Sequence, residues 1–292
     1  MVQATLMYGI GATKAGTSWL HRYFSAHPEC AMPVLKELHY FDGLESGSWK
    51  RQIAYVDREI ARLQEKQSRF SGPFGDKLRT RQARLGEWRE ILEESGKDPQ
   101  AYLSYLTRGA EDLRLVGDVT PAYALLPVPR LAQMAALAPV TRFVYILRDP
   151  VARIWSNIRM MARRQAARTD EIAPLAHRIV NRVLSGAENE ITARSDYASA
   201  LARLDAAVPS ASLFLGLYES LFSQETMARL CRFLGLSEQP ADFEKRVHDG
   251  VPLKLEDEAR FALQRLLAPQ YACVEARLGA LPEAWQHNMV KA

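Results

Sequence analysis

The stretch YGIGATKAGTSWLHRYFSAHP, residues 8–28, decides the fold class of this sequence. A short apolar run ends in a turn with Gly11 and Gly16, and a helical pattern follows directly, as in a phosphate-binding loop between a strand and a helix. In the usual nucleoside-triphosphate loop a lysine follows the second glycine and reaches the terminal phosphates. Here Thr17 occupies that position and Lys14 lies inside the loop. We therefore expect the loop to bind an anionic group other than the triphosphate of a common ATPase.

The loop offers donors of several kinds. Successive backbone N–H groups and the positive end of the helix dipole favour an anion, and Thr17 and Ser18 add hydroxyl donors. Mg²⁺-dependent phosphoryl transfer needs a lysine after the second glycine and a carboxylate at the end of another strand. The best candidate strand ends in YILRDP, which offers Arg148 first. A group with less charge than a γ-phosphate could be bound by Lys14 and backbone amides without a metal.

Strand and helix signals alternate along the chain. Four short runs, rich in β-branched or aromatic residues, predict parallel strands buried on both faces: ATLMYGI, LRLVGDVT, TRFVYIL and SLFLGLY. Helices are expected at about 17–26, 50–66, 98–108, 150–165, 194–207, 220–234 and 256–279. The alternation predicts an α/β fold with a central parallel sheet flanked by helices. Ligands in such sheets bind at the carboxyl ends of the strands.

Size and composition indicate a single globular unit. The chain has 292 residues, 48% of them hydrophobic and 25% charged, which is enough to bury a full core. We expect one domain over 1–292, in which residues of about 44–110 form a mostly helical insertion over the sheet edge. Within this segment, residues 66–84 contain more basic than acidic residues. The basic residues are Lys66, Arg69, Lys77, Arg79, Arg81 and Arg84, and the acidic residue is Asp76. This run indicates either a solvated helix surface or contact with an anionic or polyhydroxylated acceptor.

The sequence also bears on location and partners. No apolar run approaches the roughly 20 residues that span a bilayer, and the N-terminus does not resemble a signal peptide. Cys30, Cys231 and Cys273 are odd in number and far apart, which favours core thiols in a reducing compartment. We expect a cytoplasmic protein or a trimmed soluble catalytic domain. The net charge of +4 is too small to imply nucleic acid, and the scattered histidines imply no metal.

Two motifs resemble those of the sulfotransferases that depend on 3′-phosphoadenosine-5′-phosphosulfate (PAPS). Their 5′-phosphosulfate loop has a T-K-x-G-T-[ST] core, which is matched here by Thr13, Lys14, Gly16, Thr17 and Ser18, with Ala15 at the variable position. Their second motif binds the 3′-phosphate through an arginine at a strand end and a serine eight residues later. Arg148 and Ser156 in ILRDPVARIWSNI have this spacing. An arginine fork suits a phosphate. Arg148 would also suit a plain ion pair at a strand end.

A third match resembles the heparan-sulfate-type glycan sulfotransferases. KELHYFD, residues 36–42, is similar to their K-E-x-H-[FY]-F-D segment, GDVTPAY to their G-[ED]-x-[ST]-P-x-Y segment, and LLAPQYACVEARLGALPEAW to their closing helix. In those relatives the glutamate is proposed as the general base for the acceptor hydroxyl. The resemblance therefore implies that Glu37 is the base, with His39 as runner-up or partner. In an extended segment these two side chains would point to the same face.

The resemblance implies sulfuryl transfer from PAPS to a hydroxyl acceptor, with a glycan or glycoconjugate favoured. Lys14 would stabilise charge on the phosphate as the acceptor attacks sulfur in line. Trp19 and Tyr218 match residues near adenine, but each also suits an aromatic core. The Lys-Gly-Arg loop that closes on the nucleotide is not reproduced in HDGVPLKLED, where Lys254 is a weak substitute. The alternatives are a small-molecule kinase that uses ATP and Mg²⁺, and a non-catalytic nucleotide- or glycan-binding module.

Overall fold

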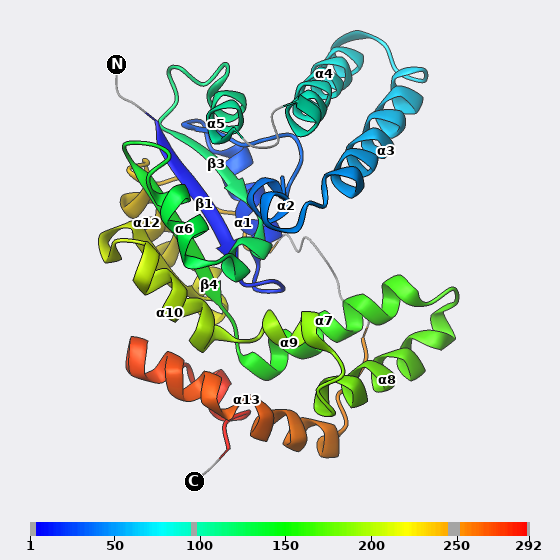
Figure 1. Ribbon diagram of the computed structural model, residues 1–292, viewed down its shortest axis with the longest axis vertical. Coiled ribbons are helices and arrows are strands. Elements are labelled where there is room, and N and C mark those ends of the chain that lie inside the picture. Colours follow the sequence, from blue (N-terminus) through cyan, green and yellow to red (C-terminus); the bar gives the residue numbers. More distant parts are fainter. Residues whose placement is uncertain (1–3, 95–97, 245–251, 291–292) are drawn as a thin grey trace.

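The computed structural model describes residues 4–94, 98–244 and 252–290. Within these ranges a five-stranded sheet has the order β2-β3-β1-β4-β5, and all neighbouring strands are parallel (Figure 1). The strands are β1 (Thr5–Gly11), β2 (Cys30–Ala31), β3 (Leu115–Val119), β4 (Thr141–Leu147) and β5 (Leu213–Leu217). The predicted α/β class with a central parallel sheet is confirmed. The four predicted strands are present, whereas β2 has only two residues and therefore no pattern to detect.

Burial explains why the strands read as continuous apolar runs. Nearly every residue of β1, β3 and β4 is buried, because helices cover the sheet. β1 lies between β3 and β4 in the order of the sheet. Since the strands are parallel, the chain leaves β1, β3 and β4 at the same edge of the sheet. These exits place three segments side by side: the loop after β1, the 3₁₀ helix η1 (Pro121–Leu125) after β3, and the helix after β4.

Helices make up most of the remaining structure. They are α1 (Thr17–Ala26), α2 (Tyr40–Ser46), α3 (Trp49–Gln67), α4 (Gly72–Glu94), α5 (Pro99–Thr107), α6 (Val128–Ala135), α7 (Pro150–Gln165), α8 (Ile172–Leu184), α9 (Asn189–Ala193), α10 (Tyr197–Ala207), α11 (Tyr218–Leu221), α12 (Gln224–Leu234), α13 (Asp257–Leu278) and α14 (Glu283–Gln286). Short 3₁₀ turns also occur at Thr169–Glu171 and Ser210–Ser212. The predicted helix at 220–234 is interrupted, because Ser223 caps α12 by accepting a hydrogen bond from the Thr226 N–H. α2, α4, α6, α8, α9 and α14 were not predicted individually.

The segment at 44–110 forms a hairpin of α3 and α4, followed by α5. The hairpin projects from the sheet at the upper right of Figure 1. The two helices are separated by residues 68–71, and α4 begins at Gly72 within SGPFGDK, because proline fits the first turn of a helix. Part of the basic run is paired on the hairpin surface: Arg69 with Glu65, Arg79 with Asp76 and Arg84 with Glu87. That residues 1–292 form one domain stays a prediction.

The sheet and helices share an apolar core, and the three cysteines lie in it or against it. One cluster of buried apolar side chains joins the sheet, the flanking helices and α4. Cys231 is buried as expected of a core thiol, whereas Cys30 and Cys273 are half-buried, and all three are free. None of the helices in the described ranges has the length and apolarity needed to cross a lipid bilayer.

Candidate functional site

The loop between β1 and α1 has the geometry of an anion site. Gly16 precedes α1 with φ +83°, and a Cβ there would lie 2.8 Å from Leu221 Cδ2 and 3.3 Å from Tyr218 Cδ2. Both the backbone and the available space therefore require glycine. α1 has no side-chain cap and no acidic residue in its first turn. Its first N–H groups, next to Thr17 and Ser18, are thus available to an anion at the positive end of the helix.

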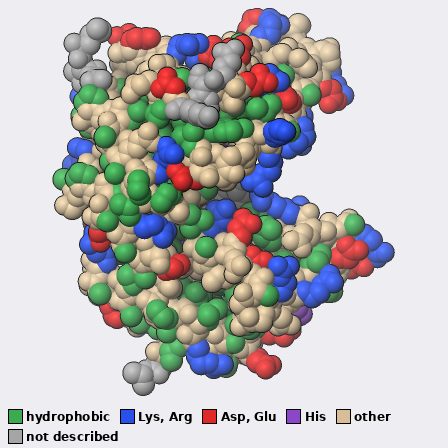
Figure 2. Space-filling model, in the orientation of Figure 1, with side chains coloured by type: hydrophobic (Ala, Val, Ile, Leu, Met, Phe, Trp, Pro, Cys, Tyr) green, Lys and Arg blue, Asp and Glu red, His purple; other side chains and the backbone are tan. Residues whose placement is uncertain are grey.

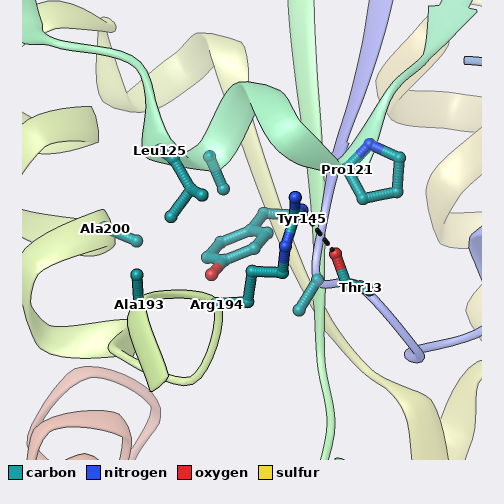
Figure 3. A pocket seen from close by; sticks show the side chains of 9 residues that line it. Thr13, Pro121, Leu125, Tyr145, Ala193, Arg194 and Ala200 are labelled. Carbon is teal, nitrogen blue, oxygen red and sulfur yellow. Dashed lines mark hydrogen bonds between the residues drawn. The ribbon is translucent and has the colours of Figure 1, made fainter. Parts of the chain in front are cut away.

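Two arginines donate hydrogen bonds to Thr13 of the loop. Arg153 is fully buried and donates to the carbonyl oxygens of Thr13 (3.4 Å) and Ile191 (3.0 Å). Burial lowers its pKa to about 10. Arg194 donates to Thr13 Oγ1 at 3.2 Å, as the dashed line in Figure 3 marks. The cavity that Arg194 and Tyr145 line there is about 10 Å³, room for about one water molecule. This cavity is therefore too small for a phosphate or sulfate group.

Sequence reasoning missed both of these arginines. Arg153 stands within the motif ILRDPVARIWSNI, so its position was a usable signal. Arg194 has no comparable signal, because it reaches the loop from the segment after α9.

Lys14 lies in a strongly positive environment. Its Nζ is 3.8 Å from Met160 Sδ on α7. Burial lowers the pKa of Lys14, and nearby cations lower it further: Arg148, Arg164, Arg159 and Lys36. Such a site disfavours one more positive charge and favours an anionic ligand.

Arg148 connects the second motif to the loop. Its Nη1 donates to the carbonyl oxygen of Lys14 at 2.9 Å, and its guanidinium lies 4.5 Å from the centre of the Tyr218 ring. The Tyr197 hydroxyl donates to the Arg148 carbonyl oxygen at 2.8 Å, which fixes the end of β4. The structure thus brings Lys14, Arg148 and Tyr218 together from β1, β4 and β5. Ser156 lies two turns into α7 and is half-buried, and its phosphate contact stays a prediction.

The contacts of Trp19 and Lys254 do not show whether either residue reaches a nucleotide. Trp19 is buried, donates to the carbonyl oxygen of Asp242 at 3.2 Å, and stacks with Tyr23 and Phe243. Its contact with adenine therefore stays a prediction. Residues 248–251 of HDGVPLKLED lie outside the described residues. Lys254 is exposed and follows Leu253, whose carbonyl oxygen accepts a hydrogen bond from Trp155 of α7 at 3.0 Å.

Within KELHYFD, residues 36–39 form a charged turn and residues 40–42 begin α2. Glu37 has φ +65° and His39 has φ +54°, so the alternation of a strand does not apply. The two side chains still meet, because His39 Nε2 lies 3.4 Å from Glu37 Oε2. Lys36 Nζ donates to Glu37 Oε1, and His39 Nδ1 lies 2.8 Å from Asp42 Oδ2. The turn therefore holds a carboxylate between two cationic partners.

Left-handed backbone marks the three predicted catalytic residues. Among the described non-glycine residues, only Lys14, Glu37 and His39 have positive φ. Such conformations cost free energy and tend to persist at functional sites, where the surrounding structure enforces them. The strain thus coincides with the residues that the sequence motifs single out.

Charge assigns different protonation states to Glu37 and His39. Burial raises the pKa of Glu37, but the hydrogen bond from His39 and the charge of Lys36 lower it to about 2. Burial lowers the pKa of His39, but its hydrogen bonds to Asp42 and Glu37 raise it to about 9. At neutral pH, Glu37 is ionised and His39 is protonated. Of the two groups, the carboxylate is the one without a proton at neutral pH, and Lys36 and His39 weaken its basicity while they contact it.

The site opens toward a notch in the molecular surface. Figure 2 shows this notch at the right, between the α3–α4 hairpin and the α7–α8 pair, with Lys and Arg side chains on its inner wall. The cations that act on Lys14 come from three segments, with Arg148 after β4, Lys36 before α2, and Arg159 and Arg164 on α7. In the described part of the chain, no group of three or more His, Cys, Asp or Glu residues could hold a metal ion.

Comparisons with known proteins agree with the fold and the loop. The family model described as "Sulfotransferase family" matches residues 8–240. A solved sulfotransferase from Alicyclobacillus acidocaldarius shares the fold, with 21% identity, a TM-score of 0.63, and coverage of 98% of this chain and 100% of that chain. The sulfotransferase domain of the Synechococcus PCC 7002 olefin synthase is 18% identical (TM-score 0.49; 98% and 90% covered). The sulfotransferase domain from the curacin biosynthetic pathway is 16% identical (TM-score 0.48; 91% and 98% covered). No curated protein matches the sequence.

Proposed function

The chain belongs to the sulfotransferase family, and from this premise we propose that it transfers a sulfuryl group from PAPS to a hydroxyl acceptor. One observation carries the proposal: Arg148 donates to the Lys14 carbonyl oxygen at 2.9 Å although the two residues are 134 positions apart. The motifs expected to bind the two phosphate-bearing ends of PAPS therefore form one site. The site also fits an anionic donor in its glycine cradle, uncapped helix end and cluster of cations.

The residues divide the work of the reaction. PAPS supplies an activated sulfuryl group, and 3′-phosphoadenosine-5′-phosphate (PAP) leaves with the electrons of the broken S–O bond. The loop amides and Lys14 stabilise the charge that grows on the phosphate oxygens. Glu37 accepts the acceptor's proton as its oxygen bonds to sulfur. His39, held by Asp42, orients the Glu37 carboxylate. Lys36 donates a hydrogen bond to Glu37 Oε1. This bond must break before the acceptor hydroxyl can hydrogen-bond to the same oxygen.

The acceptor class rests on the turn at residues 36–42. Its resemblance to the heparan-sulfate-type enzymes favours a carbohydrate acceptor, for which the surface notch between the α3–α4 hairpin and the α7–α8 pair is a candidate entrance (Figure 2). A small-molecule kinase is the second candidate, because the loop lies between a buried strand and a helix as in the ATP-binding proteins. The position of Lys14, before the second glycine, disfavours it.

Calorimetric titration tests the donor. We expect PAP to bind tightly without a metal, and ATP with Mg²⁺ to bind weakly. The reverse pattern would replace the proposal with the kinase reading.

The variant Glu37→Gln tests the base. We expect it to keep its PAP affinity and to lose at least about 100-fold in sulfuryl transfer to a screened hydroxyl acceptor. Glu45→Gln is the matched control, because Glu45 is a carboxylate of the neighbouring α2 that pairs with Arg130 away from the turn. Retained transfer in Glu37→Gln would move the base to His39.

A further inference from the structure

The motif GDVTPAY has no role in the chemistry described so far, yet it contains a buried carboxylate. Asp118, at the end of β3, is fully buried. Its oxygens accept hydrogen bonds from Tyr123 Oη (2.7 Å), Thr120 Oγ1 (2.7 Å) and Tyr102 Oη (3.1 Å). The pKa of Asp118 is raised, because the effect of burial exceeds the opposing effects of these hydrogen bonds and of the charge of His39. A polar group buried so deeply needs such partners, and they in turn are fixed by it.

Tyr123 connects this carboxylate to the catalytic turn. Its hydroxyl donates to Asp118 Oδ2 and accepts a hydrogen bond from the backbone N–H of Tyr40 at 3.1 Å. Tyr40 is the first residue of α2 and directly follows His39. The first N–H groups of a helix have no partner within the helix, and the His39 side chain does not cap α2. The Tyr123 hydroxyl therefore supplies the partner that the helix itself lacks.

The strain of the left-handed turn and the cost of an unpaired buried N–H group are comparable in free energy. Glu37 and His39 hold left-handed backbone, which costs free energy at any residue other than glycine. Leaving a buried N–H without a partner costs free energy of the same order. If the Tyr123 hydroxyl were removed, relaxation of the turn would relieve strain, and the hydrogen bond that resists this relaxation would be gone. The turn would then leave the geometry in which Glu37 meets His39.

We propose that Tyr123, held by Asp118, is the positioning residue of the catalytic turn: its hydroxyl anchors the start of α2 and so keeps Glu37 and His39 in place. The proposal rests on the proposed function for its catalytic consequence. It rests on the hydrogen bonds alone for its structural consequence.

Two phenylalanine substitutions separate positioning from general stability. Tyr123→Phe and Tyr102→Phe each remove one hydroxyl that donates to Asp118 Oδ2, and both rings are fully buried. Only Tyr123 also contacts the turn backbone through the Tyr40 N–H. We expect Tyr123→Phe to lower kcat about 10–100-fold with little change in KM for PAPS. Tyr102→Phe should lose a similar amount of thermal stability but stay within about 3-fold of the parent kcat.

A second readout does not need activity. In Tyr123→Phe the Tyr40 amide should exchange with solvent at least about 10-fold faster, and the His39 pKa, followed by NMR, should fall from about 9 toward its ordinary value of 6.5. Tyr102→Phe should change neither. Unchanged exchange at Tyr40 and unchanged His39 titration in Tyr123→Phe would overturn the proposal. If the parent transfers no sulfuryl group but these two shifts occur, the proposed function fails and the anchoring stands.

Asp118→Asn covers the case in which Tyr123→Phe does not fold. It keeps every ring in place and weakens the hold on the Tyr123 hydroxyl. We expect it to lower kcat and the His39 pKa in the same direction. A folded Asp118→Asn protein with parental kcat and parental His39 titration would also overturn the proposal.

Discussion

At the scale of single residues, the surroundings of Lys14 disfavour its positive charge in the ligand-free protein. Lys14 has left-handed backbone, and its pKa is lowered first by burial and then by Arg148 and other cations. The folded state thus disfavours the charged ammonium relative to the unfolded state. An anionic donor would remove this penalty, which couples donor binding to the charge of Lys14.

Lys14→Met should separate activity from stability. We expect turnover to fall by more than roughly 100-fold, because one electrostatic stabiliser of the phosphate is lost. The melting temperature of the ligand-free protein should stay the same or rise, because the variant has no disfavoured charge. Lys77→Met, at an exposed position on α4, should change neither quantity. A marked fall in melting temperature with parental turnover would contradict the role given to Lys14.

The residues of the site were predictable to different degrees. Lys14, Glu37 and Arg148 have charged side chains at fixed spacing from glycine or strand signals, so motifs reveal them. Arg153 and Arg194 act on Thr13 from 140 and 181 positions away. Such contacts depend on how α7 and the segment after α9 pack, and a single sequence does not contain that information.

At the scale of elements, the segment before α2 was given no definite structure from the sequence. An extended KELHYFD would place Glu37 and His39 on the same face, but hydrogen bonds among Lys36, Glu37, His39 and Asp42 hold a left-handed turn instead. Positive φ is uncommon at non-glycine residues, although less so at histidine than at glutamate. The tertiary bond from Tyr123 to Tyr40 supports the turn. The strands and α1 were predicted well, because local burial and periodicity determine them.

The turn should make stability depend on pH. The pKa of His39 is raised to about 9 from 6.5, so its stabilising effect is complete below pH 6.5 and is lost as pH rises through 9. One pKa unit corresponds to about 1.4 kcal/mol, so the loss should reach on the order of 3 kcal/mol. The lowered pKa of Glu37 acts in the opposite range, where its contribution is lost only as pH falls toward 2.

Urea unfolding between pH 6 and pH 10 measures this loss. His39→Gln should be less stable than the parent at pH 6 and should lack the decline toward pH 10. His177→Gln should retain the decline, because the exposed His177 lies beside Glu256, away from the turn. Parallel pH profiles for the parent and His39→Gln would show that His39 is not held in its charged form.

At the scale of the whole molecule, the C-terminal segment contacts the end of β4, beside the proposed nucleotide site. Asp149 follows Arg148 directly and caps α7 by accepting a hydrogen bond from the Ala152 N–H at 2.6 Å. Its other contacts come from the far end of the sequence, with Tyr271 Oη of α13 at 2.9 Å and Asn288 Nδ2 at 3.1 Å. The pKa of Asp149 is raised, because the effect of burial exceeds the opposing effect of these hydrogen-bond donors. The end of β4 is therefore fixed by a segment more than a hundred residues away.

Tyr271→Phe should transmit a change at α13 to the donor site. Removing the hydroxyl leaves a buried carboxylate short of one donor, which should lower the free energy of unfolding by about 1–3 kcal/mol. Because Arg148 is the neighbour of Asp149 and contacts the Lys14 carbonyl oxygen, PAP affinity should fall several-fold as well. Arg277 lies on α13 like Tyr271, and Arg277→Ala breaks a more exposed ion pair with Asp205 of α10. This variant should lose less than about 1 kcal/mol and keep its PAP affinity. Unfolding and calorimetric titration of both variants measure these effects. If Tyr271→Phe loses stability but keeps full PAP affinity, the C-terminal helix supports the fold without setting the position of Arg148.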